Sequence, residues 1–350
     1  MVGFGAFLTL TDAGGRNHRD VYRDALETAE IAEHIGCDSV WINEHHFMGF
    51  SICPDTLTMA AALLARTKSI RVGNAVSLIP TQHPISIAER ASQLDNLSGG
   101  RFDLGLGRGG YPLDSLVFGM PTANLARCLD DGIPIIHRAL TGEYTGGAAS
   151  LWPFPSVRIS PRPFTKPHLP ILVAGQSDTT MAIAASRGLG LLLSWHQTHA
   201  EREAVVRRYD DALTAAAWAG PRPTHVGSAV AFIGESREAA RAELQPHFRA
   251  WLASGASGTF DPNAEGAFAG AIDELKVFAS KNAARLDASV ERLLNNNPVG
   301  TVDDVAAWFR EDMVRTGTRR YAVFFDIIPD RTRALLNLKQ LLTQIAPALS

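Results

Sequence analysis

Short apolar runs alternate with amphipathic stretches along the whole chain. The runs are typical of buried strands, and the stretches repeat their apolar residues every three or four positions, as helices do. Strands are predicted at 3–10, 38–43, 70–79, 101–107, 171–174, 189–195, 224–233 and 321–325. Helices are predicted at 18–34, 55–65, 85–97, 124–140, 180–187, 200–217, 237–253 and 331–348.

This alternation of about eight strand–helix units predicts an α/β fold, a (β/α)8 TIM barrel formed by residues 1–350 as a single domain. An open doubly wound sheet is the alternative. Two segments fall outside the repeat. Residues 142–170 are rich in Gly, Ser and Pro and predict an excursion after the fourth helix. Residues 254–298 predict a long mobile loop or lid before the last strand, and Thr301 with Asp304 then resembles a capping box that opens one more helix.

Composition narrows the class of protein. With 350 residues, 46% of them hydrophobic and 20% charged, the chain can bury a large core. A net charge of −3 gives no basic footprint for nucleic acid. No apolar segment reaches the ~18 residues needed to span a bilayer, and no secretory leader is evident. Three scattered cysteines, Cys37, Cys53 and Cys128, predict reduced thiols in a cytoplasmic protein and neither a disulfide framework nor a metal site.

Residues suited to chemistry follow the ends of three predicted strands, where barrel enzymes carry their active sites. Glu44, His45 and His46 follow the first of these strands. Residues 105–110 follow the second; their glycines permit close approach of a ligand, and the guanidinium of Arg108 suits phosphate. Residues 175–180 follow the third, where backbone N–H groups and hydroxyls at a helix start make a phosphate seat.

Each motif also has an ordinary structural explanation. Adjacent histidines can simply end a strand, and Arg108 can pair with an acidic neighbour. Ser177, Asp178 and Thr179 are residue types that commonly cap helices and bind nothing. Three such motifs at strand ends of one barrel nevertheless favour a shared ligand.

The glycines at 105–110 also match the dinucleotide motif G-x-G-x-x-G. That motif should open a helix at once and should be followed by an acidic residue at the end of the next strand. Here Pro112 intervenes, and helical periodicity resumes only near Asn124. Asp130 and Asp131 lie within that helical pattern. A Rossmann fold is therefore disfavoured.

Seven segments in order along the chain together resemble the bacterial luciferase-like flavin monooxygenases, and luciferase α subunits most of all. The segments are 40–47, 72–84, 98–102, 108–109, 117–119, 193–195 and 297–301. They extend over almost the whole chain. The resemblance implies a (β/α)8 barrel that takes reduced FMN from a separate reductase, activates O2, and oxidises an aldehyde, ketone or other small hydrophobic molecule.

The resemblance also implies roles for individual residues. His45, with Glu44, would be the acid/base group near the reacting edge of the flavin. Ala75 and Val76, joined by a cis peptide, would lie beneath the isoalloxazine. The other implied cofactor-binding residues are Arg108, Ser177 and Thr180 at the phosphate, with Gln176, Asp114 and Trp195 nearby. Residues 254–281 match the family's lid, which keeps water from the site.

Two departures from the luciferase pattern limit what is implied. Gly107 stands where luciferases carry a reactive cysteine, which puts light emission in doubt but leaves oxygenation intact. Gln176 replaces a glutamate beside the phosphate seat. Apolar pocket candidates are Phe7, Phe47, Tyr111, Trp195 and Phe232.

Two other functions remain open. One is a deazaflavin-dependent oxidoreductase on the same barrel, and the other is a non-catalytic flavin-binding subunit. His45 argues against the second, because a binding-only protein has no use for that histidine. By resemblance the chain would pair as a homodimer or a heterodimer.

Overall fold

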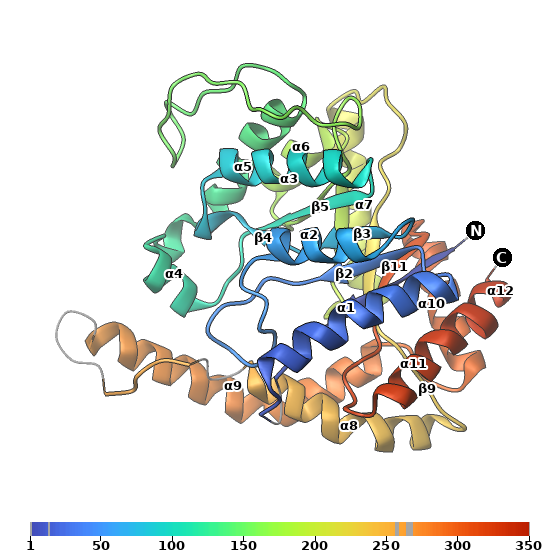
Figure 1. The fold of residues 1–350 in the computed structure, drawn as a ribbon. Coiled ribbons are helices and arrows are strands. Elements are labelled where there is room, and N and C mark those ends of the chain that lie inside the picture. Colours follow the sequence, from blue (N-terminus) through green and yellow to red (C-terminus); the bar gives the residue numbers. More distant parts are fainter. Residues whose placement is uncertain (1, 13–14, 256–258, 264–268, 350) are drawn as a thin grey trace.

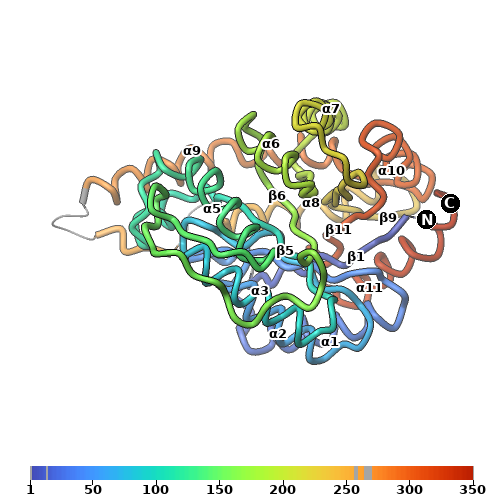
Figure 2. The backbone as a smooth tube through the Cα atoms, turned by 90° about the horizontal axis from the view of Figure 1, so that it is seen from above, coloured from blue at the N-terminus to red at the C-terminus, as the bar shows by residue number. Residues whose placement is uncertain are grey.

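The structure, a computed structural model, describes residues 2–12, 15–255, 259–263 and 269–349. Within these ranges a parallel sheet of eight strands closes into a barrel, because β3 pairs with both β2 and β5 (Figures 1 and 2). The strands are β1 (Gly3–Leu8), β2 (Ser39–Ile42), β3 (Arg71–Asn74), β5 (Phe102–Gly107), β6 (Ile171–Ala174), β7 (Gly190–Leu193), β8 (Val226–Val230) and β11 (Arg320–Phe324). The predicted barrel is confirmed, and the open sheet is excluded.

Helices surround the barrel close to the predicted positions. They are α1 (His18–Ile35), α2 (Thr56–Arg66), α3 (Pro84–Ser98), α5 (Leu125–Leu140), α6 (Asp178–Ala185), α7 (His199–Ala215), α8 (Arg237–Ser254), α10 (Val302–Thr316) and α11 (Arg331–Gln340), which continues through η4 (Leu341–Ile345) and α12 (Ala346–Ala348). The predicted caps explain several boundaries. Asp55 accepts hydrogen bonds from the first turn of α2, and Thr301 and Asp304 form the capping box of α10.

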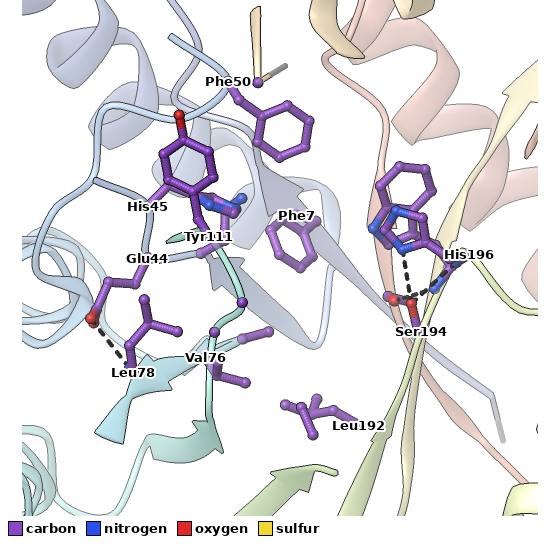
Figure 3. A pocket seen from close by; sticks show the side chains of 18 of the residues that line it. Phe7, Glu44, His45, Phe50, Val76, Leu78, Tyr111, Leu192, Ser194 and His196 are labelled. Carbon is purple, nitrogen blue, oxygen red and sulfur yellow. Dashed lines mark hydrogen bonds between the residues drawn. The ribbon is translucent and has the colours of Figure 1, made fainter. Parts of the chain in front are cut away.

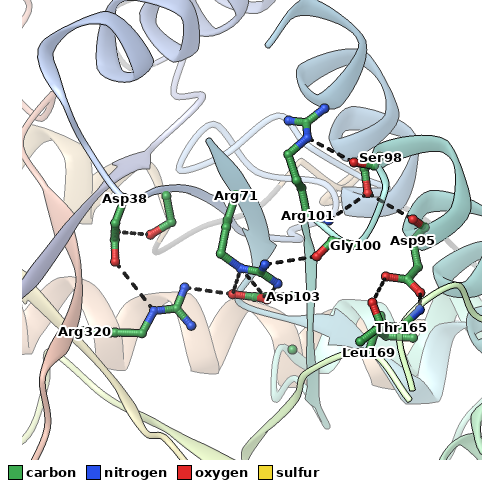
Figure 4. A network of polar contacts seen from close by, with 12 residues as sticks. Asp38, Arg71, Asp95, Ser98, Gly100, Arg101, Asp103, Thr165, Leu169 and Arg320 are labelled. Atoms are coloured by element: carbon green, nitrogen blue, oxygen red, sulfur yellow. Dashed lines mark hydrogen bonds and ion pairs between the residues drawn. The ribbon is translucent and has the colours of Figure 1, made fainter. Parts of the chain in front are cut away.

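Ion pairs close the end of the barrel where the strands begin (Figure 4). Asp103 on β5 is fully buried and accepts hydrogen bonds from Arg71 of β3 and Arg320 of β11. Arg320 also lies 3.6 Å from Asp38. In barrel enzymes this end serves stability, so the opposite end is left for a ligand.

The predicted strand at 70–79 is interrupted in its middle. β3 ends at Asn74, a cis peptide joins Ala75 to Val76, and β4 (Ser77–Leu78) then pairs again with β5 before η1 (Ile79–Thr81). The predicted strand at 224–233 is likewise divided, because β9 (Phe232–Ile233) leaves the barrel and pairs with β10 (Val299–Gly300).

The predicted long loop before the last strand is wrong for most of its length. Residues 269–296 form α9 (Ala269–Asn296), a helix of 28 residues that lies beside α8 (Figure 1). Its buried residues Leu275, Val290, Leu293 and Leu294 recur at helical spacing. The parts of the predicted loop at 256–258 and 264–268 lie outside the described residues.

A short helix also occurs where none was predicted. α4 (Pro112–Phe118) follows β5 almost at once and leads through η2 (Thr122–Asn124) into α5. Proline suits the first position of a helix, because its missing N–H would have no partner there. The Rossmann fold is therefore excluded by the closure of the sheet and not by a missing helix.

The excursion at 142–170 is irregular, as predicted, with one bridge between Thr145 and Val157. It packs on α3, where Asp95 accepts a hydrogen bond from the backbone N–H of Thr165 at 2.7 Å. All three cysteines are buried and unbonded. Among the described helices, none combines the length and the apolar character that crossing a bilayer would require.

Candidate active site

Two adjoining cavities open where the barrel strands end. The inner cavity, of about 430 Å³, extends between the ends of β1, β2, β7 and β11. The outer cavity, of about 560 Å³, borders the ends of β5 and β6. Six residues line both: Val76, Gly109, Ala174, Leu192, Ser194 and His196. One elongated ligand can therefore lie across the two.

The interrupted strand forms the floor of the site, because Val76 lines both cavities. Figure 3 shows Val76 at the inner one. The backbone N–H of Ala75 donates to the carbonyl of Ile42 at 2.7 Å. The side-chain amide of Asn74 donates to the carbonyl of Gly105 at 3.0 Å and accepts from its N–H at 2.9 Å. The cis peptide that the resemblance implied at Ala75–Val76 is present, and it places Val76 on the border of both cavities.

Glu44 fixes the segment that follows the cis peptide. Its buried carboxylate accepts hydrogen bonds from the backbone N–H of Leu78 at 3.2 Å and from Thr81 Oγ1 at 3.3 Å. Burial raises the pKa of this carboxyl, although nearby His46 opposes the shift. These contacts suit a positioning role for Glu44, whereas its predicted catalytic role stays a prediction.

His45 borders the inner cavity. Its ring meets Phe50 edge-on at 5.1 Å and makes no hydrogen bond within the described part of the chain. Burial, with a smaller contribution from His46, lowers the pKa of His45 to about 4. The imidazole is therefore neutral at pH 7, where it can accept or donate a hydrogen bond but does not serve as a charged acid.

Asp114, in the first turn of α4, brings a second acidic group to the inner cavity. Burial raises the pKa of Asp114 to about 6, and Glu44 adds to the shift. Its Oδ1 is buried and has no hydrogen-bond partner among the residues described. His46 Nε2 is also buried without a hydrogen bond among these residues, although it lies 3.5 Å from Glu44 Oε1. Unpartnered buried polar atoms are costly, so Asp114 Oδ1 lacks the hydrogen-bond donor that its burial calls for.

The outer cavity has the features of an anion site. Arg108 lines it together with Gly175 and Gln176 at the end of β6. In the part of the chain that the structure describes, the exposed guanidinium of Arg108 has no ion-pair or hydrogen-bond partner. No acidic residue in the described ranges pairs with Arg108, as the alternative explanation would require.

The predicted phosphate hydroxyls are only partly available. Ser177 caps α6, and its hydroxyl donates to Thr180 Oγ1 at 2.8 Å. Thr180 Oγ1 in turn donates to Asp130 Oδ1 at 2.9 Å. Neither residue lines either cavity, so the structure brings Arg108 and Gln176 together but leaves Ser177 and Thr180 at the margin.

Aromatic rings build the far wall of the inner cavity. Phe7 stacks on Phe324 with ring centroids 3.9 Å apart, and Phe50 stacks on Trp251 at 4.2 Å. Trp195 borders the cavity between these pairs. Of the five predicted pocket aromatics, Phe7, Tyr111 and Trp195 line the cavity, whereas Phe47 and Phe232 do not.

Two further polar residues, which sequence reasoning missed, stand opposite His45 (Figure 3). Ser194 Oγ lies 3.0 Å from His196 Nδ1, and both residues border the two cavities. Trp195 between them is held by Ser228 Oγ, which accepts its backbone N–H, and by Asn297, which donates to its carbonyl. The matching segment 193–195 was the available signal.

Gly107 stands where the resemblance implies a cysteine in luciferases, and here it packs closely against Val76. A Cβ atom at Gly107 would collide with Cγ2 of Val76. The side chain of Val76 therefore occupies the space that a larger residue at position 107 would need.

The helix α9 contacts the rim of the site at two points. Phe278 packs near Tyr111, with ring centroids 5.7 Å apart. Further along α9, Arg292 donates to the carbonyl of His196 at 3.1 Å. A small apolar cluster, formed by Leu113, Ile272 and Leu275 with Phe47, Tyr111, Leu116 and Phe260, joins α9 to α4. The helix thus occupies the place predicted for a lid.

Known proteins resemble this chain along its full length. It is 25% identical over 349 residues to the alkanal monooxygenase alpha chain of a Kryptophanaron alfredi symbiont, which covers 99% of this chain and 98% of the relative.

Solved structures share the fold. The oxygenating constituent of 3,6-diketocamphane monooxygenase of Pseudomonas putida, solved in complex with FMN, has a TM-score of 0.78 at 21% identity, over 100% of this chain and 99% of the other. An F420-dependent secondary alcohol dehydrogenase has a TM-score of 0.74 at 14% identity, over 100% of this chain and 99% of the other.

The sequence model of the luciferase-like monooxygenases matches residues 3–320, which is most of the chain. Together with the closed barrel and the placement of the site at its C-terminal rim, this match establishes that the chain belongs to the luciferase-like monooxygenase family.

Proposed function

We propose that this protein is the oxygenase component of a two-component system. It takes FMN reduced by a separate flavin reductase and uses O2 to oxidise a small hydrophobic molecule such as an aldehyde or ketone. The observation that carries the proposal is the pair of joined cavities, with Val76 on their common border, Arg108 in the outer one and His45 in the inner one.

The residues present fit FMN. A flat ring system needs a floor of small groups, which Ala75, Val76 and the glycines at 107 and 109 supply. A phosphate needs a cation. The guanidinium of Arg108 lines the outer cavity and forms no ion pair with any residue that the structure describes. When bound, reduced FMN supplies the electrons with which O2 is activated.

The chain's own residues hold and protect that chemistry. Glu44 fixes the backbone at Leu78, and so the floor of the site. His45, neutral at pH 7, is suited to accept or return a proton at its free imidazole nitrogen. The aromatic wall binds an apolar substrate and excludes water, and α9 covers the rim.

The second candidate is a deazaflavin-dependent oxidoreductase that moves hydride without O2. The F420-dependent alcohol dehydrogenase has a similar fold over the whole chain, and Arg108 suits the phosphate of either cofactor. A non-catalytic flavin-binding subunit is the third candidate, and the position of His45 at the inner cavity argues against it. A homodimer or heterodimer is part of the proposal by family likeness.

The test is oxygenation under ¹⁸O2 with a flavin reductase supplying reduced FMN. The panel contains long-chain aldehydes and cyclic ketones. We expect one product to gain a single ¹⁸O atom, and His45→Ala to abolish this while FMN affinity stays within about tenfold. Unlabelled products, combined with turnover of a reduced deazaflavin, would favour the second candidate; unchanged turnover by His45→Ala would remove His45 from the mechanism.

A further inference from the structure

A third cavity, of about 470 Å³, lies behind the aromatic wall of the inner cavity. The ends of β1 and β11 form it together with α1, α8 and α11. Successive side chains of a strand point to opposite faces, so Phe7 and Phe324 line the inner cavity, whereas Leu8 and Phe325 line this one. The two cavities share a wall but no lining residue.

The lining is mostly apolar, with two charged side chains that are incompletely bonded. Its aliphatic members include Leu8, Leu10, Val21, Ile327, Ile328 and Leu335. Besides its four Asp and Arg side chains, the lining contains Thr9, Thr11, Thr28 and His247. An apolar hollow with several convergent polar groups is typical of small-molecule sites. Nothing in the proposed oxygenase chemistry uses it.

Asp326 supplies an unpartnered acceptor. Its Oδ2 accepts the backbone N–H of Thr9 at 3.1 Å. Its Oδ1 is buried and has no hydrogen-bond partner among residues 2–12, 15–255, 259–263 and 269–349. Burial raises the pKa of Asp326 to about 6, so the carboxyl is mainly ionised at pH 7 and its free oxygen requires a donor.

Arg331 supplies an unpartnered donor. Its Nη1 donates to Glu27 Oε2 at 2.7 Å. Its Nε is buried and likewise lacks a partner in the described chain. The remaining charges of the lining compensate each other, because Arg16 pairs with Asp24. Asp326 and Arg331 therefore each carry one unpartnered group, and the Asp and Arg side chains of the lining have no net charge that would select an ion.

We propose that this cavity is a second ligand site, which binds a small neutral amide with a compact apolar body. The amide N–H donates to Asp326 Oδ1, and the amide carbonyl accepts from Arg331 Nε. A carboxylate of the same shape would repel Asp326, and an alkylammonium would leave the Arg331 donor unbonded beside a second cation. The aliphatic residues accommodate the body of the ligand.

The test is a titration with hexanamide, followed by NMR on protein labelled at Ile, Leu and Val methyl groups. We expect saturable shifts at Leu8, Ile327 and Ile328, with a dissociation constant on the order of 1 mM for so small a probe. Methyls of the inner cavity, such as those of Leu78 and Leu192, should not move. Hexanoate and hexylamine should bind at least tenfold more weakly.

Two tryptophan variants on α11 give a matched control. Leu335→Trp fills the cavity and should abolish the shifts, whereas Leu336→Trp, at a neighbouring exposed position, should preserve them. Equal binding of hexanoate or hexylamine, shifts confined to Leu78 and Leu192, or undiminished binding by Leu335→Trp would overturn the proposal. The experiment needs no flavin, so its failure would leave the proposed oxygenase function unaffected.

Discussion

The side-chain amide of Asn74 bonds both backbone groups of Gly105. These two hydrogen bonds replace the backbone hydrogen bonds between β3 and β5 at the point where the cis peptide at Ala75–Val76 ends β3. Asn74 also donates to Ser77 Oγ at 2.9 Å, at the start of β4. One buried carboxamide thus holds both ends of the segment that forms the cavity floor.

Asn74→Asp should therefore damage both stability and the site. A carboxylate cannot donate to the carbonyl of Gly105, and it adds an unpaired buried charge. We expect a loss of about 2–4 kcal/mol in the free energy of unfolding, measured with urea. Asn96→Asp is the control, because Asn96 also donates to backbone carbonyls but is exposed. Similar losses in the two variants would contradict the role given to Asn74.

The contact between Gly107 and Val76 predicts a rescue. Gly107→Ala should weaken binding of reduced FMN by at least about tenfold, because the added methyl displaces Val76 from the cavity floor. Adding Val76→Ala makes room for that methyl and should restore most of the affinity. Equilibrium binding to the single and double variants measures both effects. A double variant that binds no better than Gly107→Ala would refute the steric explanation.

The apolar cluster between α4 and α9 predicts how the lid acts. Leu275 is 3% exposed within this cluster, whereas Val277, on the same helix, is 51% exposed. Leu275→Asp should detach the start of α9 from α4, since a buried unpaired carboxylate is strongly unfavourable. We expect more hydrogen peroxide released per reduced FMN consumed, because water then enters the site.

Val277→Asp is the matched control and should leave that ratio unchanged. If both variants couple oxygen use to product formation as well as the parent does, α9 does not shield the site.

A buried histidine predicts part of the pH dependence of stability. His225 Nδ1 accepts the backbone N–H of Leu191 at 3.0 Å, and burial lowers the pKa of His225 to about 4. The unfolded chain takes up this proton near pH 6.5. The stabilising contribution of the neutral ring is therefore complete above about pH 6.5 and is lost as the pH falls toward 4.

His225→Asn keeps an acceptor and removes this titration. Between pH 6.5 and pH 4, the free energy of unfolding of the parent should fall by up to about 3 kcal/mol more than that of the variant. Urea unfolding at each pH measures both. Asp114 and Asp326 act in the opposite sense, because their raised pKa values stabilise the fold at low pH. They are common to both proteins and cancel in the comparison. His34→Asn, at an exposed position, should show the same pH dependence of stability as the parent. If His225→Asn also shows the pH dependence of the parent, His225 is not the group responsible.

The sequence predicted the barrel because alternation of strands and helices is a local signal. The strand at 171–174 and the caps at Asp55 and Thr301 were located correctly for this reason. The glycine-rich start of the segment at 254–298 hid the helix α9, although Leu275, Val290 and Leu293 carry its periodicity. The proline at the start of α4 was interpreted as a break, although that position favours it.

The site was only partly predictable, because it depends on which strand ends meet. Glu44, His45 and Arg108 stand at strand ends and were found from sequence. Ser194 lies in the matching segment 193–195, but His196 gives no signal of its own. Both become part of the site only when β7 closes against the rest of the barrel. The hydrogen bond from Thr180 to Asp130, fifty positions away in sequence, was equally invisible.

The most direct measurement is anaerobic binding of reduced FMN compared with reduced riboflavin, which lacks the phosphate. The parent protein should bind FMN at least about tenfold more tightly, and Arg108→Ala should remove that preference, which corresponds to about 1.5–3 kcal/mol for a charge-assisted contact. Arg207→Ala, on the exposed side of α7, should retain it. Equal affinities of the parent for the two flavins, or an Arg108→Ala protein that still prefers FMN, would contradict the account.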